Sequence, residues 1–388
     1  MFTEAEARAE VVAAGIRLVE SGLIARTWGN VSARISDTEF LITPTGRDYL
    51  TLQPEEIVPV SIAELSHRGE IKPSAEKGVH AAIYGARPGV QFIVHTHQDF
   101  ASAISAAQVP GIAAGPGYPL LGGRVLTAKY AMPSTKPLAK NVAQALAKSA
   151  GRAIILRNHC ALCFAATPEE AFQAAADLES ACEDAIRAAY CSSARQAEYD
   201  GDHMRELALF RIAGGRVVSA GTPLRLRSER GANGIELPAG EDRTAAAVQA
   251  EAAVHEAIYA KRPDVHSIVP AVGQDMLTLA RGLLAVKPML DDFAQIVGPA
   301  MRIAHGSPED IADALGSTAA VTVEGRGALC CGPNHADAEA VRMIVEKNER
   351  AYLWSALLGP VKPIRWVDTQ LMRAVYLRKY SRQISQNV

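Results

Sequence analysis

The sequence predicts an α/β protein that contains two copies of one folding unit. The first observation is an internal repeat, because residues 75–94 (AEKGVHAAIYGARPGVQFIV) and 250–269 (AEAAVHEAIYAKRPDVHSIV) are identical at twelve of twenty positions. The second observation is that short apolar runs alternate with segments of helical periodicity, as in layered α/β domains. A further pair, RNHCALC and EGRGALC, extends the repeat. We therefore assign one domain to residues 1–212 and a second, degenerate domain to residues 213–388.

The elements of the first copy follow from local signals in chain order. Thr3 and Glu6 form a capping box, which predicts a helix that continues to about Ser21. Pro73 and Ser74 predict the start of the helix that carries the repeated segment. Alternating or continuous apolar residues predict strands at VSARIS, EFLITP, QFIVHTH and AIILRNH, and apolar faces predict helices at about 99–107, at 136–149 and from Pro168 onward.

Composition and charge exclude several classes of protein. The 388 residues contain 40 Lys plus Arg and 42 Asp plus Glu, a formal net charge of −2, without the basic surface of a nucleic-acid binder. No apolar run is long enough to span a membrane, and the start, MFTEAEARAE, does not resemble a signal peptide. Six cysteines are too few for a disulfide scaffold. We expect a cytoplasmic protein with a small-molecule substrate and no nucleic-acid or membrane partner.

Three histidines stand at the ends of predicted strands. His95 and His97 are two residues apart at the end of QFIVHTH, so a regular strand would direct both imidazoles to one face. His159 follows the other long apolar strand. A lone histidine at such a position is more often an ordinary structural residue, whereas three with one open position match a catalytic zinc site.

Glu76 lies near the start of the repeated helix. A carboxylate there either caps the helix or acts as a general acid/base beside a metal. The second copy keeps this residue as Glu251 but has Pro270, Val272 and Arg326 where the three histidines stand in the first copy. The three ligand positions are lost together, which is expected if they act as one unit in the first copy.

Candidate anion-binding positions occur in three turns. Gly29 and Asn30 precede a strand, Thr45 and Gly46 follow another, and Ser74 stands at the predicted helix start. Main-chain N–H groups and hydroxyls in such places suit a phosphate or carboxylate. Residues of these types are also common in ordinary turns.

The ordered motifs resemble those of the class II aldolase/adducin family. TWGNVSAR, LITPTG, PSAEKGVHAAIY, RPGVQFIVHTH, AKYAMPST and LRNHCAL carry the resemblance over about residues 5–190, and about residues 215–360 resemble a degenerate form of the same fold. The resemblance implies two tandem α/β/α layered domains, each with a central mixed sheet. Its best-known enzymes resemble L-fuculose-1-phosphate aldolase.

The family resemblance also assigns roles to individual residues. It implies one divalent metal per chain, usually zinc, with manganese, cobalt and iron open, and it gives the acid/base role to Glu76. It implies that Tyr130 serves the far fragment of the substrate. The family's metal ligands fall on His95, His97 and His159, and its phosphate-binding positions fall on Gly29, Asn30, Thr45, Gly46 and Ser74.

The activity that the resemblance implies is a metal-dependent lyase of carbohydrate metabolism. Aldol-type cleavage of a small hydroxy-carbonyl metabolite leaves an enediolate whose charge a metal stabilises. A decarboxylase, a dehydratase or an epimerase would use the same site, and a non-catalytic adducin-like scaffold remains an alternative. Ala75 replaces a serine that phosphate-using aldolases often have, which weakens the case for a phosphorylated substrate. The family also implies a homo-oligomer, a dimer or tetramer.

Overall fold

The chain forms two compact units. The computed structural model describes residues 2–21, 23–24, 28–232, 234–238, 240, 244–282 and 285–379. The first unit is built mainly from Met1–Ser192, and the second mainly from Ser193–Leu357 and Val361–Ser381. The assignment of domains to residues 1–212 and 213–388 stays a prediction, and the helix Gly201–Ala213 is part of the second compact unit.

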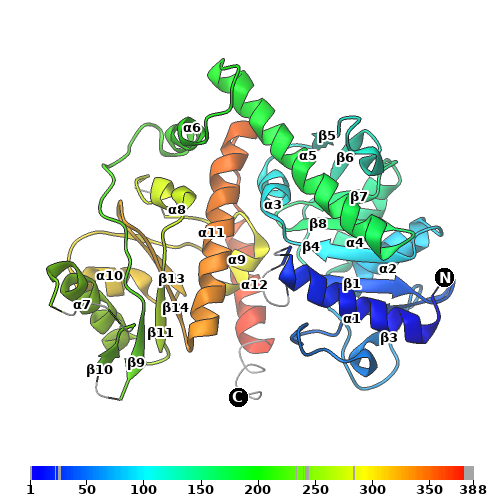
Figure 1. Cartoon of the computed structure of the whole chain (residues 1–388), viewed down its shortest axis with the longest axis horizontal. Helices are drawn as coiled ribbons and strands as arrows, with labels where there is room; N and C mark the ends of the chain where they lie inside the picture. Colours follow the sequence, from blue (N-terminus) through cyan, green and yellow to red (C-terminus); the bar gives the residue numbers. More distant parts are fainter. Residues whose placement is uncertain are drawn as a thin grey trace. The chain divides into compact units, whose positions relative to one another are not determined.

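The first unit contains an eight-stranded mixed sheet in the order β3-β2-β1-β4-β8-β7-β6-β5 (Figure 1). Only the β6–β7 pair is parallel among the pairings of its described strands. The central strands β4, β7 and β8 are buried along their whole length, as their continuous apolar runs require. The strands are β1 (Asn30–Arg34), β2 (Glu39–Ile42), β3 (Val58–Ser61), β4 (Phe92–Thr96), β5 (Gly111–Ala113), β6 (Arg124–Ala128), β7 (Ala153–Leu156) and β8 (Cys160–Ala165).

Helices cover both faces of this sheet. On one face Ile83 of α2 and Val142 of α4 join strand residues such as Ile93 in a buried apolar cluster. The helices of the other face contact one another, because Glu179 of α5 accepts hydrogen bonds from the first N–H groups of α3, and the Arg17 guanidinium of α1 lies over the ring of Phe172. The helices are α1 (Glu4–Glu20), α2 (Lys77–Ala86), α3 (Asp99–Ala106), α4 (Lys136–Leu146) and α5 (Pro168–Ala194), with short 3₁₀ turns at Pro54–Glu56 and Pro119–Leu121.

The second unit repeats this plan with fewer strands. Its mixed sheet has the order β10-β9-β11-β14-β13-β12, in which only β12 and β13 are parallel among the described pairs. The strands that correspond to β2, β1, β4, β8, β7 and β6 therefore follow one another in the same order. Their bounds are β9 (Ser228–Gly231), β10 (Gly234–Glu236), β11 (Ser267–Ala271), β12 (Ile303–Ala304), β13 (Ala320–Val323) and β14 (Gly327–Gly332).

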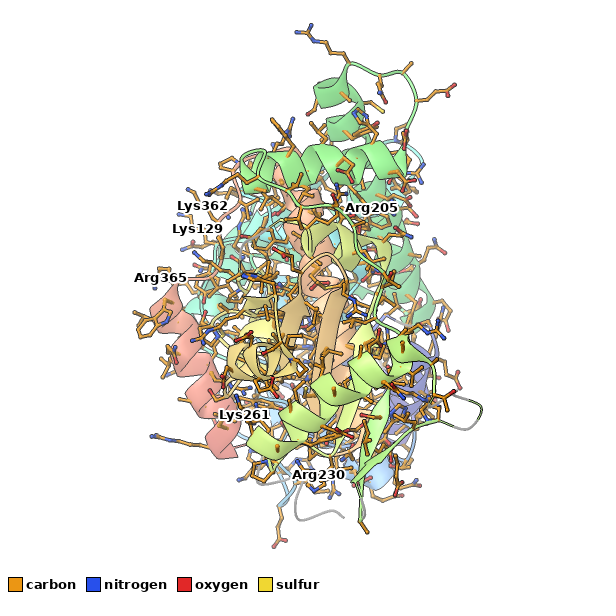
Figure 2. All side chains as sticks on the ribbon, turned by 90° about the vertical axis from the view of Figure 1, so that its left-hand side faces the viewer. Lys129, Arg205, Arg230, Lys261, Lys362 and Arg365 are labelled. Atoms are coloured by element: carbon orange, nitrogen blue, oxygen red, sulfur yellow. The ribbon has the colours of Figure 1, made fainter. Side chains whose placement is uncertain are left out.

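One face of the second sheet is covered by α7 and α10. Ile258 and Ile311 from these helices pack with Ile268 and Val321 of the sheet. Lys261, labelled in Figure 2, reaches from α7 to a carboxylate of α10. The helices of this unit are α6 (Gly201–Ala213), α7 (Ala246–Lys261), α8 (Gln274–Leu279), α9 (Asp291–Ile296), α10 (Pro308–Leu315), α11 (His335–Leu358) and α12 (Trp366–Lys379).

The structure confirms the predicted fold class and corrects one local expectation. The capping box of Thr3 is present at the start of α1. By contrast, α2 begins at Lys77 rather than at Pro73–Ser74, because the chain first forms a turn whose geometry leaves Glu76 as the residue before the helix. Within the described residues, no helix has the length and apolar character needed to cross a membrane.

Candidate metal centre and acid/base site

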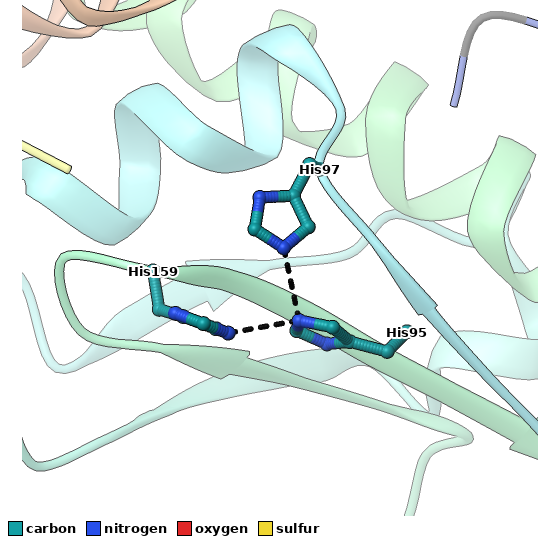
Figure 3. Close-up of side chains that lie close together, drawn as sticks. All are labelled: His95, His97 and His159. Carbon is teal, nitrogen blue, oxygen red and sulfur yellow. Dashed lines mark hydrogen bonds between the residues drawn. The ribbon is translucent and has the colours of Figure 1, made fainter. Parts of the chain in front are cut away.

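Three histidine side chains converge at one edge of the first sheet (Figure 3). His95 is part of β4, His97 comes directly after that strand, and His159 lies in the turn between β7 and β8. The Nε2 atom of His95 lies 3.0 Å from Nε2 of His97 and 2.8 Å from Nε2 of His159. One possible ligand atom from each residue falls within 4.8 Å of the others.

Strand pairing explains why residues so distant in sequence meet here. β8 lies between β4 and β7 and is antiparallel to both, so β4 and β7 end at the same edge of the sheet. The tight turn after β7 places Asn158 at φ +58°, and the N–H of His159 then donates to the carbonyl of Leu156. Because β4 ends at Thr96, the expectation that His97 continues the strand is wrong, although its ring still reaches His95.

The histidine cluster offers nitrogen donors to a cation. His95 is fully buried, and burial lowers its pKa well below the ordinary value, so its imidazole is neutral near pH 7. Two nitrogen lone pairs that face each other cannot form a hydrogen bond. Close packing of three imidazole nitrogens therefore favours a positive ion among them. The donor set therefore fits a divalent metal held by three histidines.

Glu76 completes the cluster. Its carboxylate oxygens lie 3.3 Å from Nε2 of His95 and 3.2 Å from Nε2 of His159. Burial acts to raise the pKa of this carboxyl, but the histidines, His159 foremost, hold the pKa well below its ordinary value. The amide nitrogen of Asn30 donates to the same carboxylate over 3.2 Å. A carboxylate held beside residues that could bind a metal is an arrangement suited to proton transfer.

Main-chain pairing brings two of the candidate anion-binding turns together. The N–H of Thr45 donates to the carbonyl of Lys72, and the N–H of Ser74 donates to the carbonyl of Thr43. The hydroxyl of Ser74 accepts from the N–H of Glu76 at 3.2 Å, which joins this region to the carboxylate.

The remaining candidate anion-binding residues differ in their surroundings. Gly46 is exposed and has φ +70°, a conformation that favours glycine. Gly29 has φ +138°, and a Cβ there would lie 2.7 Å from the carbonyl oxygen of His95. Asn30 begins β1 opposite His95 and is buried. Glycine at position 29 thus permits the close approach that places Asn30 beside the histidines.

Tyr130 follows β6 on the loop before α4 and is half-buried. Since β6 is parallel to β7, the loop after β6 emerges at the same edge as His159. Its main-chain carbonyl accepts from Asn141 over 3.4 Å. The topology is thus compatible with a role for Tyr130 at the histidine edge, and that role stays a prediction.

Sequence analysis did not single out His80, a fully buried residue of α2. Its Nε2 atom contacts Oδ1 of Asn30, and its Nδ1 atom lies 2.7 Å from the hydroxyl of Ser32. The repeat contained a signal, because a histidine occupies this position in both copies and a buried histidine requires hydrogen-bond partners. Its connection to Asn30 on another element could not be read from the spacing.

The corresponding place in the second unit holds an ion pair. Arg326 donates to Glu251 over 2.6 Å, and the main-chain N–H groups of Arg225 and Leu226 donate to the other carboxylate oxygen over 3.0 and 2.9 Å. Glu251 is only 3% exposed. A guanidinium therefore supplies the positive charge in the second unit, at a position where the first unit has His159.

Fold and site together define an α/β protein with a three-histidine cluster and an adjoining carboxylate. The sequence profile described as Class II Aldolase and Adducin N-terminal domain matches residues 9–186 and 202–353. The chain belongs to the class II aldolase/adducin family. The match in two segments agrees with the two copies and confirms the predicted resemblance.

Relatives within this family have different activities. The chain is 31% identical over 180 residues to 5-deoxy-D-ribulose 1-phosphate aldolase of Bacillus thuringiensis serovar kurstaki, covering 44% of this chain and 80% of that protein. It is 35% identical over 107 residues to methylthioribulose-1-phosphate dehydratase of Pectobacterium atrosepticum, covering 28% of this chain and about half, 52%, of that protein. A solved L-fuculose 1-phosphate aldolase is 29% identical with a TM-score of 0.45, covering 52% of this chain and 94% of that chain.

Proposed function

We propose that this chain is a metal-dependent lyase that cleaves a small phosphorylated hydroxy-carbonyl compound by aldol-type chemistry. The observation that carries the proposal is the meeting of three buried imidazole nitrogens with the Glu76 carboxylate in the first unit. The chain is similar to an aldolase of a ketose 1-phosphate over most of that enzyme's length, which supports a sugar phosphate as the substrate class.

His95, His97 and His159 are the residues that would hold the metal, one ion per chain and zinc in the first instance. Zinc is the first choice because three imidazoles and an open position are its usual catalytic set, while manganese, cobalt and iron accept the same donors. A bound divalent ion supplies Lewis-acid stabilisation of the negative charge that develops next to a carbonyl.

The chain's own residues move the protons. Aldol cleavage breaks one C–C bond, removes a proton from the hydroxyl that becomes the new carbonyl, and returns a proton to carbon on the retained fragment. Glu76 transfers the proton that the carbon of the retained fragment receives. Tyr130 acts at the oxygen of the fragment that leaves as the new carbonyl compound. For the phosphate, the turns that contain Thr45, Gly46 and Ser74 supply the two hydroxyls and the N–H of Gly46, together with Gly29 and Asn30.

A dehydratase is the second candidate, since methylthioribulose-1-phosphate dehydratases are among the relatives. Both reactions start from a ketose 1-phosphate and build negative charge beside its carbonyl. They differ in the bond that breaks, C–C in one and C–O in the other. Product analysis therefore separates them: an aldehyde and a three-carbon phosphate indicate the lyase, whereas a diketo phosphate of unchanged carbon number indicates the dehydratase. Decarboxylation would release CO₂, and epimerisation would return an isomer.

The first experiment is elemental analysis of the purified chain, with His159→Ala as the matched control. We expect about one equivalent of metal per chain, lost in the control. The loaded protein is then incubated with 5-deoxy-D-ribulose 1-phosphate and L-fuculose 1-phosphate, and aldehyde release is followed. A chain that takes up no metal when offered zinc or manganese would instead be an adducin-like scaffold. Light scattering tests the further proposal of a homodimer or homotetramer.

A further inference from the structure

A buried chain of hydrogen bonds leads from the core of the first unit to Glu76. The hydroxyl of Tyr84 lies 2.8 Å from the hydroxyl of Ser32, which lies 2.7 Å from Nδ1 of His80. Nε2 of His80 contacts Oδ1 of Asn30, whose amide nitrogen donates to Glu76 over 3.2 Å. Ser32 and His80 are fully buried, and Asn30 is 4% exposed. The acid/base of the proposed reaction is thus connected to a chain of buried side chains.

The chemistry of each group sets the direction of every bond in this chain. An ionised carboxylate only accepts, so the amide nitrogen of Asn30 faces Glu76 and its oxygen faces His80. His80 must then donate from Nε2. Burial lowers the pKa of His80 to about 4, so its ring is neutral near pH 7, and Nδ1 accepts from the hydroxyl of Ser32. Ser32 in turn accepts from Tyr84, and the pattern is self-consistent from end to end.

The second unit contains the same buried serine, histidine and tyrosine, but it lacks the asparagine that connects them to a glutamate in the first unit. The hydroxyl of Ser228 lies 2.7 Å from Nδ1 of His255 and 2.9 Å from the hydroxyl of Tyr259. Leu226 occupies the place of Asn30, and Nε2 of His255 has no hydrogen-bond partner among the described residues. Arg230, labelled in Figure 2, donates to the carbonyl of Tyr259, as Arg34 does to that of Tyr84 in the first unit. Serine, histidine and tyrosine are therefore common scaffold, and only the first unit extends them to a carboxylate.

We infer that His80 is a positioning residue that, through Asn30, fixes the orientation of the Glu76 carboxylate for proton transfer. The inference rests on the proposed function, because it concerns the acid/base of that reaction. Glu76 stands just before α2 without a cap hydrogen bond from its own side chain, and Asn30 donates to Oε2, the same oxygen that lies 3.3 Å from Nε2 of His95, so the amide restrains the carboxylate where it meets the histidines. Residues that orient an active group from behind typically contribute 10–100-fold to activity.

The test compares two substitutions of His80 with the same change in the second unit. His80→Leu removes the donor to Asn30, and we expect kcat to fall about 10–100-fold while KM stays within about threefold and metal content is unchanged. His80→Gln restores an N–H near the position of Nε2 and should recover most of kcat. His255→Leu breaks the equivalent serine contact and should leave kcat unchanged. Equal kcat in His80→Leu and the wild type would overturn the inference.

A second measurement separates this inference from the proposed function. In ¹⁵N-histidine-labelled protein, Glu76→Gln should shift the Nε2 resonance of His80, since it changes the acceptor at the far end of Asn30, and should leave that of His255 unmoved. An unmoved His80 signal overturns the inference whatever the activity. Failure of the wild type to turn over any ketose 1-phosphate, with the His80 signal responding to Glu76→Gln, would count against the proposed function alone.

Discussion

Two glutamates that occupy equivalent positions in the two units have different partners. Glu76 and Glu251 both belong to the repeated pattern AExxVHxAIY, Glu76 as the residue before α2 and Glu251 within α7, and both side chains are largely buried. Glu76 faces His95 and His159, whereas Glu251 is paired with Arg326 and two main-chain N–H groups. A shared helix sequence therefore reproduces the scaffold, while the residues at the facing strand ends decide what the carboxylate can do.

The substitution of Arg326 for His159 has a simple electrostatic consequence. A buried carboxylate is costly unless a positive charge or several hydrogen bonds accompany it. In the second unit a guanidinium provides that charge permanently, since arginine stays protonated at any physiological pH. In the first unit imidazoles stand where the second unit has the guanidinium, and an exchangeable ion held by them would supply the charge. The carboxylate of the first unit is thus available for proton transfer, whereas that of the second unit is neutralised by an ion pair.

The largest effect is expected from removing a metal ligand in the first unit. His97→Ala should abolish metal retention and lower turnover by at least about 10³-fold, because several kcal/mol of charge stabilisation are lost with the ion. Metal per chain and kcat are measured on the same sample. Val272→Ala changes the equivalent position of the second unit and should alter neither quantity. Full activity in His97→Ala would contradict the proposed site.

The next effect concerns the carboxylate itself. Glu76→Gln should lower kcat by about 10²–10⁴-fold, the usual range for a general acid/base, while metal remains near one per chain. Glutamine keeps the shape of the side chain, so a loss of activity in this variant reports the loss of proton transfer. Glu251→Gln is the matched control, and its kcat should equal that of the wild type. A drop of similar size in both variants would mean that the two glutamates serve the same purpose.

The fold class could be predicted from the sequence, but the contacts that distinguish the two units could not. The repeat, the capping box of Thr3 and the apolar runs were sufficient for the fold class, because they report local periodicity. The three histidines could be grouped because strand ends meet at one sheet edge. The position of His97 beyond β4 was not predictable, since strand ends depend on ladder pairing. Neither the Asn30–His80 contact nor the Arg326–Glu251 pair was foreseen, because each joins elements whose facing depends on tertiary packing.

A smaller effect, on stability alone, is expected at Arg326. Arg326→Met leaves the Glu251 carboxylate with two main-chain donors and no positive charge, and should lower the unfolding free energy of the second unit by about 1–3 kcal/mol. This loss is smaller than the roughly 3–5 kcal/mol expected for a fully buried ion pair, because the Arg326 side chain is 30% exposed. Urea unfolding followed by Trp354 and Trp366 fluorescence measures the change. Adding Glu251→Gln to this variant should recover part of the loss, and metal content should stay at one per chain throughout.

An effect of similar size is the pH dependence of stability that His255 contributes. Burial lowers the pKa of His255 to about 3, against about 6.5 when the chain is unfolded. Above pH 6.5 neither state binds the proton and the stability is fully present. As the pH falls, the unfolded chain binds a proton that the folded ring refuses, so stability is lost between pH 6.5 and about 3.

Between pH 6.5 and 5 this one residue should contribute a loss of about 2 kcal/mol. His255→Gln removes the titrating group, so the difference between urea midpoints at pH 7.5 and pH 5 should shrink by the corresponding amount, even if the variant is less stable at both values. His80 titrates in the same direction but is unchanged in the variant, so its contribution cancels in the comparison. An undiminished pH difference in His255→Gln would show that folding does not lower the pKa of this ring.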